Sequence, residues 1–263
     1  MSNLQCQTSF DELFTNTHDF IHAGLWQPYY VHIYVHLPKT AGMAFGKEMR
    51  NHYPRKKLVL PLPWDQIGPI WHEYLKAGGT PEGRRIEFVY GHLTYDHIRY
   101  IYRLDTPSVT TCFIRDPLKR ILSEYNYSTS PAHPPHKDFK RNFPNFENFA
   151  LTLKPNIMAE KLVGPVYNID EYWTKLQRTY NFIGLQEQFD LSLACLRGSL
   201  GFGYELRDTS KVNTASARTS TGFEDVPQSV IEELSEKHRL DLEIFDMIQS
   251  KYDELAAKLL AAR

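Results

Sequence analysis

Five short apolar runs, rich in β-branched and aromatic residues, constrain the fold more than any other feature of this chain. Each run is nearly continuous in apolar character and is separated from the next by a segment with helical periodicity. The runs are VHIYVHL (31–37), KLVLPL (57–62), RIEFVYGH (85–92), SVTTCFIR (108–115) and YNFIGLQE (180–187). Strands that are apolar on both faces are typical of parallel sheets covered by helices. The pattern therefore predicts an α/β fold, with a central parallel β-sheet flanked by helices on both faces.

Helices are expected between these runs and after them. The expected helices are 42–52, 94–103, 117–127, 146–153, 170–179 and 188–199. From Pro227 onward, apolar residues recur at steps of three and four, which predicts an amphipathic helical C-terminal tail packed on the domain. Two segments are expected to be loops: 128–145, which is dense in Pro, His and basic residues, and 207–222, which is almost without apolar residues.

The 263 residues suffice for one sizeable α/β domain with a buried core. We expect a single domain with an N-terminal extension (1–29), a core (30–222) and a helical tail (223–263). The formal net charge is −1, so no global basic field indicates nucleic acid or a membrane surface as a partner. Any site for an anion must therefore be local.

The cysteines and the N-terminus narrow the class of protein further. The three cysteines, Cys6, Cys112 and Cys195, are far apart and form no CxxC pair, so neither a disulfide framework nor a zinc site is indicated. The N-terminus lacks the basic and apolar regions of a signal peptide, and no stretch reaches the roughly 18 apolar residues of a spanning helix. Membrane insertion is not expected, and cytoplasm is the expected compartment.

The first expected strand leads into the turn PKTAG and then into a helix. Such a P-loop-like turn presents free backbone N–H groups and the positive end of a helix dipole, which bind anions. Lys39 adds a charge and Thr40 a hydroxyl donor. The GxxxxGK[ST] pattern of nucleoside triphosphate-binding loops is absent. An ordinary strand-to-helix turn with a solvated lysine would fit this stretch equally well.

A second expected strand ends at charged residues and leads into a helix, in the stretch CFIRDPLKRILSEYNY (112–127). Arg115 falls at the carboxyl end of the strand, Asp116 suits the helix N-cap and Pro117 suits the first turn. Ser123 follows eight residues after Arg115, so the two reach one phosphate if the strand end and the helix face converge. Two anion-competent strand ends in one sheet predict a ligand with two separated phosphates.

These two motifs resemble those of the PAPS-dependent sulfotransferases, most closely the branch with the Golgi heparan sulfate 2-O- and 6-O-sulfotransferases. HLPKTAG is similar to the family's 5′-phosphosulfate loop, and RDPLKRILSEY to its 3′-phosphate motif RDPxxRxxSxY. PAPS, 3′-phosphoadenosine 5′-phosphosulfate, carries groups at both positions. The resemblance covers about residues 30 to 220. It implies in-line transfer of the sulfuryl group from PAPS to an acceptor hydroxyl, with a histidine base and no metal. It also gives an alternative to the cytoplasm, in which the chain is the trimmed catalytic domain of a Golgi-type enzyme.

The resemblance also implies roles for individual residues. Lys39 would contact the bridging oxygen and the leaving phosphate, and Arg115 and Ser123 would hold the 3′-phosphate. The remaining donor contacts would come from the turn and from a later loop, KVNTASAR (211–218): Thr40, Ala41, Gly42, Met43, Ala44, Asn213, Thr214, Ser216 and Arg218. Relatives usually carry hydroxyl residues where this chain has Met43 and Ala44, so weaker binding of PAPS is expected.

The expected general base is His92, in GHLTYDHI, because it follows a strand at the same sheet edge as the phosphate motifs. A histidine that caps the next helix, or one buried and satisfied by backbone, would fit the same position. Five other histidines are candidates. His32 and His36 are expected to be packed near the first strand, and His97 is expected to face solvent. His133 and His136 are expected in the Pro-rich loop, as acceptor contacts or plain surface.

The acceptor substrate is inferred from scattered basic residues. Basic residues in loop-like segments either line a cleft for an acidic saccharide or form a solvated surface: Arg55, Lys56, Lys57, Arg84, Arg85, Lys137, Lys140 and Arg141. We expect a hydroxyl-bearing acceptor, a saccharide or glycan or a small metabolite. Two other functions fit the same motifs: an ATP-dependent P-loop kinase-like enzyme, which would need magnesium, and a non-catalytic nucleotide- or glycan-binding relative. The sequence does not indicate the oligomeric state.

Overall fold

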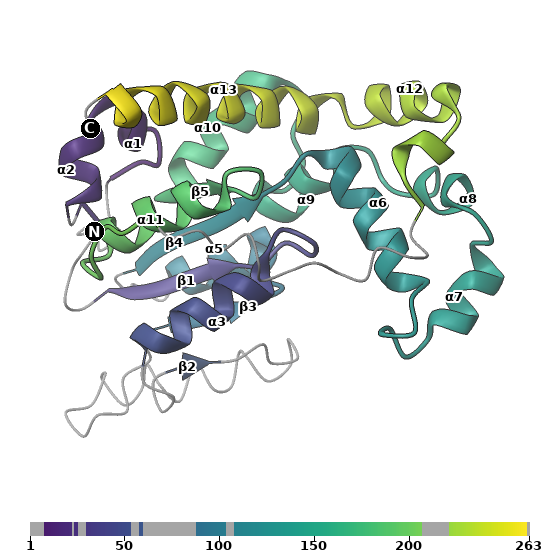
Figure 1. The fold of residues 1–263 in the computed structure, drawn as a ribbon, viewed down its shortest axis with the longest axis horizontal. Coiled ribbons are helices and arrows are strands. Elements are labelled where there is room, and N and C mark those ends of the chain that lie inside the picture. Colours follow the sequence, from purple (N-terminus) through teal and green to yellow (C-terminus); the bar gives the residue numbers. More distant parts are fainter. Residues whose placement is uncertain are drawn as a thin grey trace.

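The computed structural model describes residues 8–22, 24–25, 30–53, 58–59, 88–103, 108–206 and 221–261. A five-stranded sheet lies at its centre, with strand order β2-β3-β1-β4-β5 and parallel pairing throughout (Figure 1). The strands are β1 (Val31–Val35), β2 (Leu58–Val59), β3 (Phe88–Gly91), β4 (Ser108–Ile114) and β5 (Phe182–Leu185). The expected α/β fold with a central parallel sheet is confirmed.

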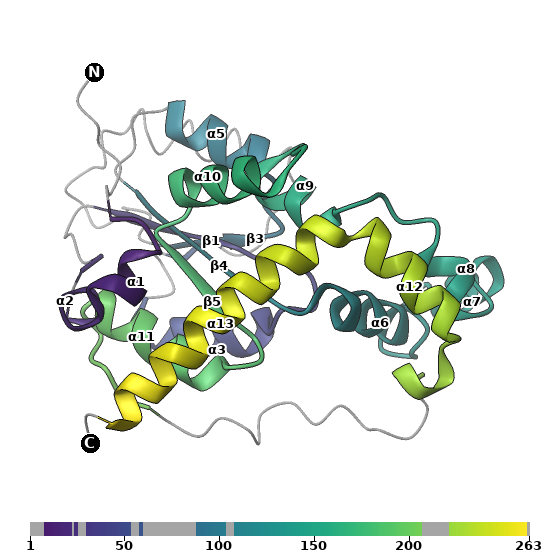
Figure 2. The same cartoon turned by 90° about the horizontal axis from the view of Figure 1, so that it is seen from above.

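Helices cover both faces of this sheet. Figure 2 shows α5, α9 and α10 on one side of the strands and α3 and α11 on the other. The helices are α1 (Glu12–Thr15), α2 (Thr17–Ile21), α3 (Gly42–His52), α5 (Tyr95–Arg103), α6 (Pro117–Ser128), α7 (His136–Asn142), α8 (Phe146–Ala150), α9 (Ile157–Val163), α10 (Ile169–Thr179), α11 (Phe189–Ser199), the 3₁₀ helix η2 (Phe223–Asp225), α12 (Gln228–Lys237) and α13 (Arg239–Ala261). The expected helical tail is therefore present, with a break between α12 and α13.

The prediction of a loop over 128–145 was wrong for its second half, which forms α7. Pro135 occupies the N-cap position of this helix. Phe139 and Phe143, four residues apart, both place their rings against Phe149, with centroids 5.3 and 5.6 Å away. Aromatic packing at helical spacing stabilises a segment whose local composition favours a turn.

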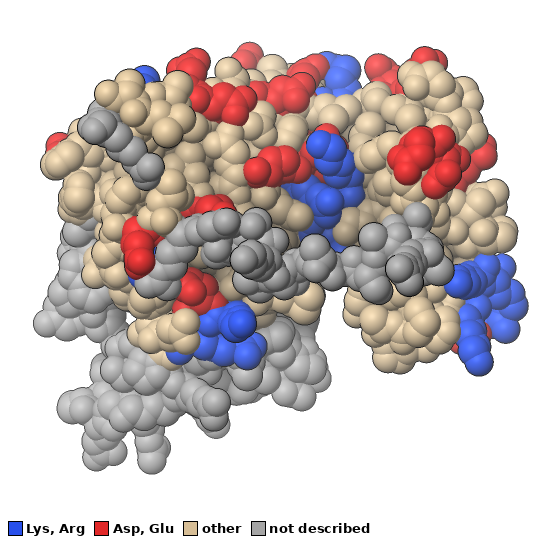
Figure 3. Space-filling view, viewed as in Figure 1, with Lys and Arg blue, Asp and Glu red and all other residues tan. Residues whose placement is uncertain are grey.

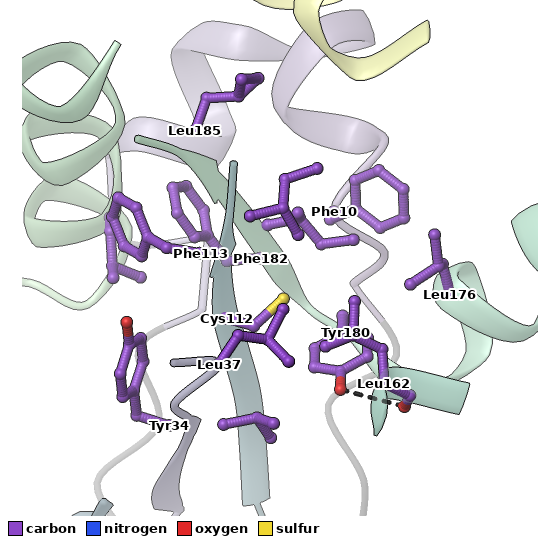
Figure 4. Packing of buried hydrophobic residues seen from close by; sticks show 14 of the residues in the cluster. Phe10, Tyr34, Leu37, Cys112, Phe113, Leu162, Leu176, Tyr180, Phe182 and Leu185 are labelled. Carbon is purple, nitrogen blue, oxygen red and sulfur yellow. Dashed lines mark hydrogen bonds between the residues drawn. The ribbon is translucent and has the colours of Figure 1, made fainter. Parts of the chain in front are cut away.

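The main core surrounds β4 and β5 (Figure 4). Cys112 and Phe113 are fully buried there, which confirms the prediction that Cys112 is a core residue. Across this core the Tyr180 hydroxyl donates to the Leu162 carbonyl at 3.1 Å. Residues of the expected N-terminal extension also pack into the cluster: Phe10, Leu13, Phe20, Ile21 and Leu25. These residues are therefore part of the domain core.

A second, smaller apolar cluster joins α6 to α8 and α12. Its centre is Tyr125 of α6, whose ring lies 5.8 Å from that of Phe146 and 5.9 Å from that of Phe149. Figures 1 and 2 show α7, α8 and α12 gathered beside α6 at one end of the molecule. This cluster fixes the position of α6, the helix that carries the second phosphate motif.

His32 in β1 predicts how the stability of the fold responds to acid. Its side chain is 2% exposed, with Nδ1 3.0 Å from the Tyr53 hydroxyl and Nε2 2.7 Å from Thr111 Oγ1. Burial lowers its pKa to about 3. As the pH falls, His32 is therefore protonated in the unfolded chain before it is protonated in the folded one. The folded state loses stability for this reason between about pH 6.5 and pH 3.

We expect the Tm to fall as the pH is lowered from 6.5 to 4, with His32 alone contributing a loss of about 2 kcal/mol at pH 5. Buried Asp241 opposes this loss, because burial raises its pKa to about 6 and the folded state takes up that proton first. Thermal melts across this pH range check the prediction. His32→Gln should give a shallower decline, and a wild-type Tm that does not change with pH would contradict it.

Candidate active site

The site lies at the carboxyl edge of the sheet, where β1, β3 and β4 end side by side. Val35 of β1 pairs with Gly91 of β3 and with Cys112 of β4, so the residues that follow these strands share one edge. The helices after β1 and β3, namely α3 and α5, lie on opposite faces of the sheet (Figure 2). This reversal makes the end of β1 a topological switch point, the place where open α/β sheets bind ligands.

The PKTAG turn has a backbone suited to an anion. Lys39 and Ala41 both have positive φ, 68° and 61°, a conformation uncommon outside glycine and found in anion-binding turns. The Thr40 side chain is buried and its hydroxyl donates to the Leu37 carbonyl at 2.8 Å, which stabilises the turn. Gly42 then opens α3, whose N-terminus has no side-chain cap. Its first backbone N–H groups are left for a ligand.

The two phosphate motifs meet at this edge. Arg115, directly after β4, donates from Nη1 to the carbonyl oxygen of Lys39 at 3.3 Å. Lys39 is half-buried, and its Nζ lies 4.3 Å from the ring centroid of Tyr127. Burial, and then the neighbouring charge of Arg115, lower the pKa of Lys39, while Glu124 opposes the shift. The structure therefore gathers two cations around an anion-competent turn.

The start of α6 is built as the sequence predicts. Asp116 is the N-cap and accepts from the Lys119 backbone N–H at 2.9 Å, and Pro117 opens the helix. The Asp116 backbone N–H in turn donates to the Glu187 carboxylate, just after β5, at 3.2 Å. Ser123 follows on α6 and is half-buried. Figure 3 shows Lys and Arg atoms flanked by acidic ones in the region where α6 begins.

His92 follows β3 and lies against His36, which follows β1. The two rings are nearly parallel with centroids 4.7 Å apart, and His92 Nδ1 lies 3.1 Å from the His36 carbonyl oxygen. Because a carbonyl can only accept, neutral His92 must carry its proton on Nδ1, which leaves the lone pair on Nε2. His92 itself is exposed. It is thus an oriented imidazole beside the PKTAG turn, and its Nε2 can accept a proton.

His36 is held from several sides. Its Nδ1 lies 3.1 Å from the Tyr90 hydroxyl, which donates to the Gly42 carbonyl at 3.2 Å. Burial, with smaller contributions from His92 and Lys39, lowers the pKa of His36 to about 3. A neutral ring therefore links β3, the His92 side chain and the start of α3.

Gly42 cannot be replaced without moving this ring. A Cβ on Gly42 would overlap His36 Nε2, and His36 is fixed by its stacks and its Tyr90 contact. We expect Gly42→Ala to lower stability by about 1–3 kcal/mol, the usual cost of overpacking, and to displace His92 as well. Gly46→Ala is the control, since its Cβ would meet Tyr90 at an ordinary 3.5 Å. Equal Tm and activity in the two variants would contradict this.

The other candidate histidines have different surroundings. His32 is packed in β1, as expected. His97 was expected to face solvent, but it is half-buried and its Nδ1 accepts from the Thr94 backbone N–H at 2.8 Å. It therefore fills the capping role that was considered for His92. In the Pro-rich segment the His133 ring lies 5.3 Å from that of Tyr127, and His136 Nδ1 is 3.0 Å from the His133 carbonyl.

Several expected contacts lie outside the described residues: Asn213, Thr214, Ser216 and Arg218. The chain re-enters the described part at Thr221, which exchanges two hydrogen bonds with the Asn126 side chain on α6, at 2.9 and 3.0 Å. The end of the predicted loop 207–222 is therefore attached to the helix that carries Ser123. In the first turn of α3, Met43 is 76% exposed and Ala44 is half-buried.

Two further observations concern the whole of the described chain. Within the described ranges, no group of three or more His, Cys, Asp or Glu side chains is arranged to hold a metal ion. Among the helices so described, none is both long enough and apolar enough to cross a membrane.

The comparisons with known proteins give the family of this chain. The model of the sulfotransferase family matches residues 25–247. The chain therefore belongs to the sulfotransferase family, which confirms the expected class of enzyme. Among solved structures, the crystal structure of mouse sulfotransferase SULT7A1 complexed with PAP is similar, with a TM-score of 0.41 and 14% identity over 87% of this chain and 68% of that chain. No curated protein matches the sequence.

Proposed function

We propose that this sulfotransferase takes its sulfuryl group from PAPS and transfers it to a hydroxyl of a saccharide, as its resemblance to the heparan sulfate 2-O- and 6-O- branch implies. The observation that carries the proposal is the contact between the two anion-competent turns, Arg115 Nη1 to the Lys39 carbonyl at 3.3 Å. A ligand at this edge meets a helix N-terminus, a lysine and an arginine together. That set suits the two separated phosphate groups of PAPS.

Each residue of the turn has a distinct task in this proposal. Backbone N–H groups from Thr40 to Ala44 bind the 5′-phosphate, and Lys39 stabilises the charge that develops on it as the sulfuryl group leaves. The Thr40 hydroxyl donates to Leu37, so Thr40 contributes through its backbone. Exposed Met43 likewise contributes only its main chain, which supports the expectation of weaker PAPS binding.

The 3′-phosphate is assigned to Arg115 and Ser123. Arg115 is anchored at the end of β4, and Ser123 lies on α6, whose start is fixed by the Asp116 cap. Holding the far phosphate keeps the donor in line with the acceptor oxygen, which is a positioning role. Contacts from 211–218 remain part of the proposal, supported by the attachment of Thr221 to Asn126.

His92 is assigned as the general base. Its Nε2 lone pair accepts the proton of the acceptor hydroxyl as that oxygen attacks sulfur, and the bond from sulfur to the bridging oxygen breaks. The products are a sulfate ester, the desulfated nucleotide PAP (3′-phosphoadenosine 5′-phosphate) and a protonated His92, which then releases its proton. Neutral His36, stacked on His92, adds no second positive charge while this proton is held.

An acidic saccharide is the proposed acceptor class. Figure 3 shows Lys and Arg gathered over α7, where Lys137, Lys140 and Arg141 are exposed. The segment before α7 contacts the site, since the His133 ring lies 5.3 Å from that of Tyr127. A basic helix beside the catalytic edge attracts an anionic chain. The other basic residues considered, at 55–57 and 84–85, lie outside the described residues.

A transfer assay tests the proposal. The protein is incubated with PAPS and either uronate-containing or sulfated polysaccharides, neutral polysaccharides or small alcohols, and PAP release and acceptor-bound sulfate are measured. We expect transfer without added magnesium, fastest to the acidic polysaccharides. PAP binding without transfer to any acceptor would favour the non-catalytic alternative, and phosphate transfer from ATP with magnesium would favour the kinase.

A further inference from the structure

One contact at this edge has no role in the mechanism above. Lys39 Nζ lies 4.3 Å from the centroid of the Tyr127 ring, within the range of a cation–π interaction. Tyr127 projects from α6, one turn beyond Ser123, and is 43% exposed. An exposed aromatic ring thus contacts the lysine on which the proposed chemistry depends.

We propose that Tyr127 holds the Lys39 ammonium against α6 in the ligand-free protein, and that the donor must draw the ammonium away from this ring in order to bind. Tyr127 is then a positioning residue that weakens donor affinity. This inference rests on the proposed function, because it assumes that Lys39 leaves the ring in order to bind the 5′-phosphate.

The direction of the Lys39 side chain supports the inference. The backbone N–H groups proposed to bind the 5′-phosphate belong to the turn and to the start of α3. Both ribbon views place the loop between β1 and α3 beside α6 (Figures 1 and 2). Lys39 extends to a ring on the third turn of α6. In the proposal its ammonium moves from this ring to the phosphate bound at the start of α3.

The local charges explain why the ring is occupied in the free protein. Lys39 and Arg115 are adjacent cations, and the charge of Arg115 acts against that of Lys39. The negative face of an aromatic ring and the carboxylate of Glu124 offset part of this repulsion. A phosphate carries full negative charge and attracts the ammonium more strongly than a ring does. A contact that exists only in the free state is lost on binding and so lowers affinity.

The Tyr127 ring is also placed independently of Lys39. Its partner in the Pro-rich segment is His133, with ring centroids 5.3 Å apart. The backbone carbonyl of Tyr127 accepts from Ser130, from its backbone N–H at 3.0 Å and from its hydroxyl at 2.7 Å. These contacts do not involve Lys39, so Tyr127 is available to receive the ammonium whenever the donor is absent.

The test is calorimetric titration of PAP into the whole protein and its variants. Tyr127→Leu removes the ring face and should tighten PAP binding by about 2- to 5-fold, the equivalent of an exposed cation–π contact. Tyr127→Phe keeps the ring and should bind as the wild type does. Tyr167→Leu is the matched control, because Tyr167 is 85% exposed and far along the chain from the site. Thermal melts confirm that each variant is folded.

A double-mutant comparison separates this inference from the proposed function. In a Lys39→Ala background, Tyr127→Leu should leave PAP affinity unchanged, because no ammonium is left to hold. If Tyr127→Leu binds PAP as the wild type does, or more weakly, at an unchanged Tm, the inference is overturned while Lys39 keeps its role. If Lys39→Ala itself binds PAP like the wild type, the proposed role of Lys39 fails, and the inference fails with it.

Discussion

Replacing Lys39 with alanine should lower kcat/KM for sulfuryl transfer by about 10²–10³-fold, the usual effect of removing a group that stabilises a developing anion. The chain should remain fully folded, because burial and Arg115 already disfavour the Lys39 charge and its removal relieves that repulsion. Initial rates with PAPS and a saturating acceptor, together with a thermal melt, measure both quantities. The expected combination is lost turnover at an unchanged or slightly higher Tm.

Lys47→Ala is the matched control for this variant. Lys47 belongs to the same helix-forming segment that follows the turn, but its side chain is exposed on α3. It should retain wild-type turnover. A Lys39→Ala enzyme that turns over at the wild-type rate would show that the positive charge at the PKTAG turn has no part in the chemistry.

Replacing His92 with glutamine should lower kcat by about 10²–10⁴-fold, the contribution typical of a general base. Glutamine has an amide N–H that can donate to the His36 carbonyl, as His92 does at 3.1 Å, but it has no nitrogen that can accept a proton. PAP affinity should stay near that of the wild type, since His92 is assigned to the acceptor and not to the donor. Steady-state rates and calorimetric titration with PAP measure the two effects.

A second histidine variant separates the role of His92 from a general effect of losing a histidine. His18→Gln is the control, because His18 is exposed on α2, where it pairs with its neighbour Asp19, and it should retain wild-type turnover. A collapse of PAP binding in His92→Gln, with turnover kept at saturating PAPS, would make His92 a donor contact.

The parts of the site that the sequence predicted are those set by local rules. Apolar runs located the strands, and the residue after each strand end fell at one edge because parallel strands point the same way. Asp116 and Pro117 gave the start of α6 through capping chemistry alone. Arg115 and Lys39, 76 residues apart, were predicted to share a ligand, and the structure places them in contact.

The parts that sequence patterns missed depend on tertiary contacts. His36 looked like a packed residue near β1, and only the register with β3 shows that it stacks on His92. Tyr90 and Tyr127 gave no signal beyond a high tyrosine content, because their roles arise from partners 54 and 88 residues away. Positive φ at Lys39 and Ala41 was also hidden, since the turn uses residues other than glycine.

Calorimetric titration of the protein with PAP, beside 5′-AMP and ATP with magnesium, tests the proposed nucleotide site most directly. The three ligands share adenosine, but only PAP carries the 3′-phosphate that Arg115 and Ser123 are proposed to bind. We predict that PAP binds selectively, with 5′-AMP much weaker and no requirement for magnesium. Binding of ATP in preference to PAP, or no binding of PAP, would contradict the account.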